Sequence, residues 1–75
     1  MLTYDVLLFG PLRDRFGSRS LRVELEPDIT ARQLLDHLSI DADVVKVAID
    51  GTIVSIDNVL HAQSEIAILP PVSGG

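Results

Sequence analysis

The sequence predicts an α+β domain in which a mixed sheet of about five strands packs on one main helix. One observation is a set of short segments rich in β-branched and aliphatic residues, at 2–9, 20–26, 44–49, 52–56 and 65–69. A second is one amphipathic stretch that begins at Thr30 and has the period of a helix. A third is the pair Asp50-Gly51 between two strands, which is typical of a tight hairpin. A chain of 75 residues is expected to form one domain.

The first two strands are predicted to form an antiparallel hairpin. Residues 6–9 are apolar at every position, so both faces of this strand are expected to contact apolar groups. Gly10-Pro11 ends the strand, and we expect a polar link over 13–19 with one helical turn at its start. Alternation over 20–26 then predicts a half-buried strand. It places Leu21, Val23 and Leu25 on one face and Arg22, Glu24 and Glu26 on the other.

The helix has a clear beginning in the sequence. Thr30 is a favourable N-cap, and Gln33 three residues later completes a capping box. Ile29 before the cap and Leu34 at the fourth helical position are spaced for a hydrophobic staple. The apolar stripe expected to face the sheet consists of Leu34, Leu35 and Leu38. A helix of about ten residues is marginal in water by itself, so this one needs the sheet.

The second half of the chain adds three strands, which makes the order β-β-α-β-β-β. Strands 44–49 and 52–56 are joined by Asp50-Gly51 into a hairpin. A connection over 57–64 follows, in which Leu60 is expected to be the anchored residue. The last strand, 65–69, is expected to lie beside the first, as the rules for connections permit.

Composition and charge exclude several classes of function. The chain has no cysteine, which excludes disulfides, thiolate metal sites and a cysteine nucleophile. Its net charge of −5 disfavours binding to nucleic acid and suits either a partner with a basic face or simple solubility. No leader pattern opens the chain and no apolar run has the length of a membrane span. We therefore expect a soluble protein of the cytoplasm.

No catalytic or metal-binding constellation is evident in the sequence. His37 lies late in the predicted helix and His61 in a loop, without a matching set of ligands, so no metal site is expected. A solvated edge is the simplest interpretation of the carboxylates Glu24, Glu26 and Asp28. There is no nucleophile triad, phosphate loop or paired acid. The chain is not expected to be an enzyme by itself.

The C-terminal segment is the most informative part of the sequence. Pro70 and Pro71 carry no N–H donor and therefore end any sheet ladder after the last strand. We expect a domain over 1–71 and an extended tail over 72–75, which would reach about 13 Å at roughly 3.3 Å per residue. Glycines at its end would let it enter a narrow channel and deliver a terminal carboxylate. The alternative is an ordinary frayed chain end.

Two segments carry a resemblance to a known family. The end, Ile66-Ala67-Ile68-Leu69-Pro70-Pro71-Val72-Ser73-Gly74-Gly75, is similar to the tail of the molybdopterin synthase small subunits, which are ubiquitin-like β-grasp sulfur carriers. The opening, Leu7-Leu8-Phe9-Gly10-Pro11-Leu12-Arg13, resembles the same family. Related carriers of the thiamine pathway also end in Gly-Gly, usually without Pro-Pro-Val. This sequence departs from the family pattern in three places. The link after the helix is short, His61-Ala62-Gln63-Ser64 stands in place of an acidic-glycine turn, and Leu69 stands where many members have Phe.

The resemblance implies a chemistry for the tail. It implies that an E1-like enzyme adenylates the carboxylate of Gly75 with ATP, and that the carboxylate then becomes a thiocarboxylate. The tail would enter the active site of the large synthase subunit, in a heterotetramer, and donate sulfur to cyclic pyranopterin monophosphate. The chain would be the non-catalytic subunit of this sulfurtransferase, with no cofactor of its own.

The resemblance also implies site residues. Gly75 would carry the sulfur and Gly74 would be a slim spacer. Partner-binding residues would be Phe9, Arg13, Ile53, Leu69, Pro70, Pro71, Val72 and Ser73. Core positions are the rival interpretation for Ile53 and Leu69, and a solvated side chain is the rival for Arg13.

Three other functions stay open on the residues alone. The chain could carry sulfur for thiamine thiazole or another sulfur-containing product. It could be a protein modifier that is joined through Gly75 to lysines. It could also be a non-covalent adaptor with an inert tail.

Overall fold

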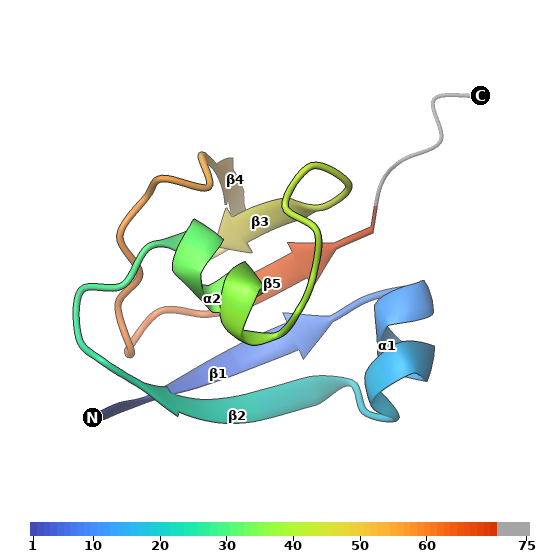
Figure 1. Ribbon diagram of the computed structural model, residues 1–75, viewed down its shortest axis with the longest axis horizontal. Helices are drawn as coiled ribbons and strands as arrows, with labels where there is room; N and C mark the ends of the chain where they lie inside the picture. Colours follow the sequence, from blue (N-terminus) through green and yellow to red (C-terminus); the bar gives the residue numbers. More distant parts are fainter. Residues whose placement is uncertain (71–75) are drawn as a thin grey trace.

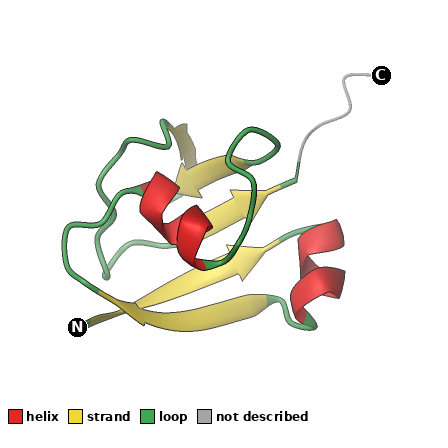
Figure 2. Cartoon of the chain, in the orientation of Figure 1, coloured by secondary structure: helices red, strands yellow, loops and turns green. Residues whose placement is uncertain are grey.

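A computed structural model describes residues 1–70, in which one five-stranded sheet packs against a helix (Figure 1). The strand order in the sheet is β2-β1-β5-β3-β4. The elements are β1 (Leu2–Leu8), α1 (Pro11–Phe16), β2 (Ser20–Leu25), α2 (Ala31–His37), β3 (Lys46–Ile49), β4 (Thr52–Val54) and β5 (Ile66–Leu69). The predicted α+β class, the five strands and the main helix are confirmed (Figure 2).

Strands β1 and β2 form the predicted antiparallel hairpin. Tyr4 pairs with Val23 and Val6 with Leu21, which places these side chains on the inner face of the sheet. We expected residues 6–9 to contact apolar groups on both faces of the strand, and this expectation is wrong for Leu7 and Phe9. Val6 is fully buried, but Leu7 on the other face is only half-buried and Phe9 is 41% exposed. The reason is that the buried cluster formed by residues 1–70 lies on one face of the sheet.

Strand β5 lies in the centre of the sheet, between β1 and β3. It pairs in parallel with β1, as expected for a last strand that returns beside the first, and antiparallel with β3. The β3–β4 hairpin has positive φ angles at Asp50 (51°) and Gly51 (85°), as a two-residue type I′ turn requires. Asp50 also exchanges two hydrogen bonds with Glu65, each 2.9 Å long, which ties this turn to the start of β5.

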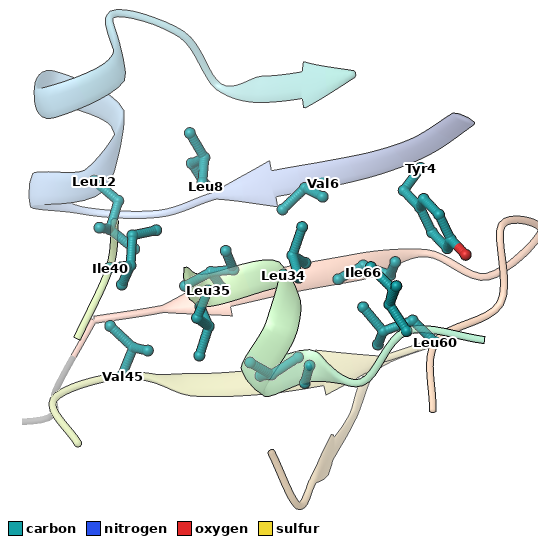
Figure 3. Close-up of a cluster of buried hydrophobic side chains, with 14 residues drawn as sticks. Tyr4, Val6, Leu8, Leu12, Leu34, Leu35, Ile40, Val45, Leu60 and Ile66 are labelled. Atoms are coloured by element: carbon teal, nitrogen blue, oxygen red, sulfur yellow. The ribbon is translucent and has the colours of Figure 1, made fainter. Parts of the chain in front are cut away.

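Helix α2 covers the inner face of the sheet. The predicted capping box is present, because the Thr30 hydroxyl accepts from the Gln33 N–H (3.2 Å) and the Gln33 side chain accepts from the Thr30 N–H (2.8 Å). Leu34 and Leu35 are fully buried (Figure 3). Leu38 is partly buried and packs against the same core. Leu60 is 1% exposed, so its predicted anchoring role is confirmed.

Several predicted boundaries are corrected by the structure. Residues 11–16 form a six-residue helix, α1, where the sequence predicted one turn in a polar link. Pro11 opens this helix and buried Leu12 fixes it to the core. The third and fourth strands are shorter than the segments 44–49 and 52–56, because only Lys46–Ile49 and Thr52–Val54 find partners in the sheet.

The phenol of Tyr4 is buried at the start of the core and donates a 3.0 Å hydrogen bond to the Glu26 carbonyl. Burial raises the pKa of Tyr4 above its ordinary value of 10.0, and the nearby charge of Asp28 adds to this shift. The folded chain therefore keeps the phenolic proton to a higher pH than the unfolded chain does.

Tyr4 predicts how stability changes in alkaline solution. Its contribution to the free energy of unfolding should be fully present below the unfolded pKa of about 10 and should be lost as the pH rises through the higher folded value. Denaturant unfolding between pH 8 and 11 measures this loss, which should be smaller in Tyr4→Phe. An equal decline in both proteins would show that Tyr4 does not cause it.

Candidate functional site

Pro70, the first residue after the central strand β5, is the root of the C-terminal segment. Because β1 and β5 are parallel, both end at the same edge of the sheet, which is the edge formed by the ends of the strands (Figure 1). Strand β5 ends at Leu69, as predicted from the prolines, and Pro70 follows as a half-buried residue. Pro71, Val72, Ser73, Gly74 and Gly75 lie outside the described residues, so their predicted roles stay predictions.

The face of the sheet opposite α2 carries an apolar row that runs across four strands. Strand register places Leu7 beside Ala67, Ala67 beside Ala48, and Ala48 beside Ile53. The alternation of β5 puts Leu69 on this same face, and Phe9, the residue that follows β1, lines a hollow together with Leu7. We call these six residues the outer apolar surface: Leu7, Phe9, Ala48, Ile53, Ala67 and Leu69.

Within residues 1–70, no helix packs on the outer apolar surface. The buried cluster contains Leu12 from α1 and Leu34 and Leu35 from α2, together with side chains from the inner face of the strands. Ile53 is 59% exposed and Phe9 is 41% exposed, whereas Leu7 and Leu69 are half-buried and the two alanines of the row are buried. The core position that rivalled the predicted role of Ile53 is therefore excluded. Exposed apolar side chains gathered on one face are typical of an interface.

Cations border this surface at the edge where the tail begins. Arg13 is exposed on α1, which fits both its predicted role and the rival interpretation of a solvated side chain. It lines a shallow hollow of about 360 Å³ together with Arg19, Phe9 and the β1 residues Leu7 and Leu8. Lys46 is exposed on β3, where it pairs in register with Leu69. By contrast, Arg15 is engaged, since it donates a 2.7 Å hydrogen bond to the Ser39 carbonyl. Although the net charge of the chain is −5, these cations make this end of the surface locally positive.

The sequence interpretation missed part of this surface. Leu7, Ala48 and Ala67 were not among the predicted site residues, and neither were Arg19 and Lys46. The signal for Leu7 was available in the sequence. Leu7 is two positions from Phe9, and in a strand it lies on the opposite face from its neighbours Val6 and Leu8, which are buried. The alanines carried no such signal, because only the strand register shows that they connect Leu7 to Ile53.

Residues 1–70 contain no group of three His, Cys, Asp or Glu side chains arranged to hold a metal ion. The exposed ion pairs are Arg22 with Asp5 (3.1 Å) and Arg32 with Asp57 (3.3 Å), and such pairs contribute little to stability. Neither helix of this part of the chain is long and apolar enough to cross a membrane. The outer apolar surface and the root of the tail are the candidate functional features of this part of the chain.

Comparison with known proteins identifies relatives over nearly the full chain. Small archaeal modifier protein 1 of Haloferax volcanii is 30% identical, over 91% of this chain and 95% of the relative. Its crystal structure superposes with a TM-score of 0.76 and covers 97% of this chain and 99% of that one, at 28% identity. The molybdopterin synthase sulfur carrier subunit of Drosophila melanogaster is 32% identical, over 100% of this chain and 93% of the relative.

A third likeness is to a complex of subunits 1 and 2 of the molybdopterin-converting factor from Helicobacter pylori, with a TM-score of 0.64. It covers 99% of this chain and 100% of that one, and at 22% identity it shows the fold alone. The ThiS family matches residues 6–75. The predicted resemblance and the ubiquitin-like β-grasp fold are thereby confirmed, and the chain belongs to the ThiS family.

Proposed function

We propose that this chain is the sulfur-carrier small subunit of a molybdopterin synthase and that it acts through a thiocarboxylate on Gly75. The observation that carries the proposal is the position of the tail root. Pro70 follows the central strand β5 at the same edge at which Phe9 and Leu69 end the outer apolar surface. A partner seated on that surface would therefore lie next to the point from which the tail starts.

The chemistry follows from the groups that the chain has. A carboxylate is a poor acceptor, so an activating enzyme of the E1 type must first join it to AMP, with release of pyrophosphate from ATP. A sulfur donor then displaces AMP and leaves a terminal thiocarboxylate. Because the chain has no cysteine, it has no thiol of its own that could carry the sulfur.

The proposed partner is the large subunit of the synthase, in a heterotetramer in the cytoplasm. Support comes from the Drosophila relative, which is named as a sulfur carrier subunit of molybdopterin synthase. The Helicobacter pylori structure adds only that a subunit with this fold occurs in a two-subunit complex. The large subunit would supply the catalytic groups and bind cyclic pyranopterin monophosphate. The carrier would deliver sulfur and recover its carboxylate.

The test is a reaction with purified components. The thiocarboxylated chain, the large subunit from the same organism and cyclic pyranopterin monophosphate should yield the dithiolene product, with regeneration of the carboxylate. Transfer of sulfur only to a thiazole precursor, in a parallel reaction with a thiazole synthase, would reassign the chain to the thiamine pathway.

A second candidate function is protein modification, which the likeness to small archaeal modifier protein 1 favours. In that reaction a lysine amine would displace AMP from Gly75 and form an isopeptide bond. Lys46 is the only lysine of this sequence, so copies could be joined to one another through a side chain at that position alone.

Lys46→Arg separates the two candidate functions. A modifier should lose the side-chain-linked ladders of its own copies, while a sulfur carrier should form thiocarboxylate at an unchanged rate, because arginine keeps the positive charge. Immunoblots of cell extracts and intact-mass spectra measure the two outcomes. If the wild-type chain forms no such ladders either, its copies are not joined to one another, which argues against the modifier.

A further inference from the structure

Gly10 and Pro70 lie side by side where two neighbouring strands leave the sheet. Strands β1 and β5 pair in parallel up to Leu8 with Ile68. Two residues further along, β1 reaches Gly10 and turns into α1, whereas β5 reaches Pro70 and continues into the C-terminal segment. The residue that turns one strand away thus borders the first residue beyond the other strand.

The space beside Gly10 is filled by the proline ring. A Cβ atom built on Gly10 would lie 3.0 Å from Pro70 Cγ, 3.7 Å from its Cβ and 3.9 Å from its Cδ. Carbon atoms in good van der Waals contact are about 3.5–4.0 Å apart, so the first of these distances is too short. The backbone of Gly10, with φ 58° and ψ −135°, also has a conformation that L side chains rarely adopt. Both observations favour glycine at this position, since any larger residue would strain the backbone and push against the ring of Pro70.

Each partner of this contact is held firmly. The Gly10 carbonyl accepts a 3.0 Å hydrogen bond from the Arg13 N–H, and the Phe9 carbonyl accepts a 3.3 Å bond from the Leu12 N–H. Leu12 is buried in the core and anchors α1. On the other side, the ring of Pro70 is closed onto its own backbone nitrogen. Its Cγ can move only as far as ring pucker allows before the backbone itself must move.

We propose that Gly10 is a positioning residue, which seats the ring of Pro70 and so sets the direction in which the C-terminal segment leaves the sheet. The functional meaning rests on the proposed function, because direction matters when Gly75 must reach an active site. A rotation of about 10° at Pro70 would move the end of the five residues that follow it, which span about 16 Å when fully extended, by about 3 Å. Misplacement of reacting groups by about 1 Å can cost about 100-fold in rate.

The variant that tests this is Gly10→Ala, with Gly17→Ala as its matched control. Gly17 also has a positive φ, of 70°, but a Cβ there would meet nothing within 4 Å. Both variants strain the backbone, Gly10→Ala more than Gly17→Ala, because Gly17 (φ 70°, ψ 21°) lies in the left-handed helical region and Gly10 does not. Only Gly10→Ala places a Cβ against Pro70, so rescue by Pro70→Ala separates this contact from the backbone strain. The direction of the tail is measured with a nitroxide on Ser73→Cys, which is the single thiol because the chain has no cysteine.

The expected result is a changed pattern of paramagnetic relaxation at the amides of α1 and β3 in Gly10→Ala and an unchanged pattern in Gly17→Ala. In unlabelled chains, kcat/KM for adenylation should fall about 10- to 100-fold for Gly10→Ala, with near-normal values for Gly17→Ala. Pro70→Ala removes Cγ and should restore part of the rate in the Gly10→Ala background.

An unchanged relaxation pattern in Gly10→Ala, or an equal change in Gly17→Ala, would overturn the proposal. Should Gly10→Ala fail to fold, Pro70→Ala alone decides the question, because loss of the ring must then change the pattern. If the unaltered chain is not adenylated by any activating enzyme of its host, the proposed function fails. The relaxation patterns would still decide whether Gly10 sets the direction of the tail.

Discussion

Deleting Gly75 should reduce sulfur transfer by the reconstituted synthase at least about 100-fold. The deletion leaves a carboxylate on Gly74, which is retracted by about 3.3 Å in an extended segment, and reacting groups misplaced by such a distance lose most of their rate. Formation of the dithiolene product from cyclic pyranopterin monophosphate measures the loss. Adenylation by the activating enzyme should fall as well, because both active sites would receive the same end of the chain.

The deletion has an internal control in partner binding. The outer apolar surface lies within the described residues and is untouched by removal of Gly75, so the Kd for the large subunit should change much less than the rate does. A truncated chain that keeps both its affinity and its sulfur-transfer rate would show that the tail is inert, as the adaptor interpretation requires. Loss of affinity on a scale equal to the loss of rate would mean that the tail mainly binds.

Replacing Ile53 with aspartate should weaken binding to the large subunit by about 2 kcal/mol or more, which is about 30-fold in Kd. Ile53 is 59% exposed and ends the apolar row across the sheet, so the new carboxylate would be desolvated in the complex without a partner. Titration calorimetry measures the affinity. The free energy of unfolding should change by no more than about 0.5 kcal/mol, because the site is exposed in the isolated chain.

Val59→Asp is the matched control for Ile53→Asp. Val59 is also an exposed aliphatic residue, at 41%, but it forms an isolated bridge with Thr30 near the start of α2 and does not belong to the outer apolar surface. Its substitution should leave the affinity within about twofold, a change of about 0.4 kcal/mol. Equal losses for the two variants would point to the added charge, and normal binding by Ile53→Asp would remove this surface from the interface.

Local signals in the sequence predicted most of the fold. The capping box of Thr30 and Gln33 and the leucine stripe identified α2, because both depend on residues within two turns of one another. Asp50-Gly51 identified the β3–β4 hairpin for the same reason, since the turn itself needs two positive φ angles. Clean alternation over 20–26 identified β2, which has one face on the core.

Features that depend on contacts distant in sequence were predicted less well. Helix α1 has only six residues, and it is held by the burial of Leu12 and by the hydrogen bond from Arg15 to Ser39. Neither is visible from local pattern. The apolar row likewise depends on the register of four strands, so its alanines were missed. The close approach of Gly10 to Pro70 joins residues sixty positions apart and appears only in the folded chain.

If the C-terminal carboxylate carries sulfur, the intact mass of the chain must change when the chain is loaded. The purified chain is incubated with the activating enzyme, ATP and a sulfur donor, and its mass is compared with that of the chain lacking Gly75. The mass should shift by one oxygen replaced by one sulfur, in the full-length chain only and only when ATP is present. An unchanged mass, with an activating enzyme that loads another carrier of the ThiS family in the same mixture, would contradict it.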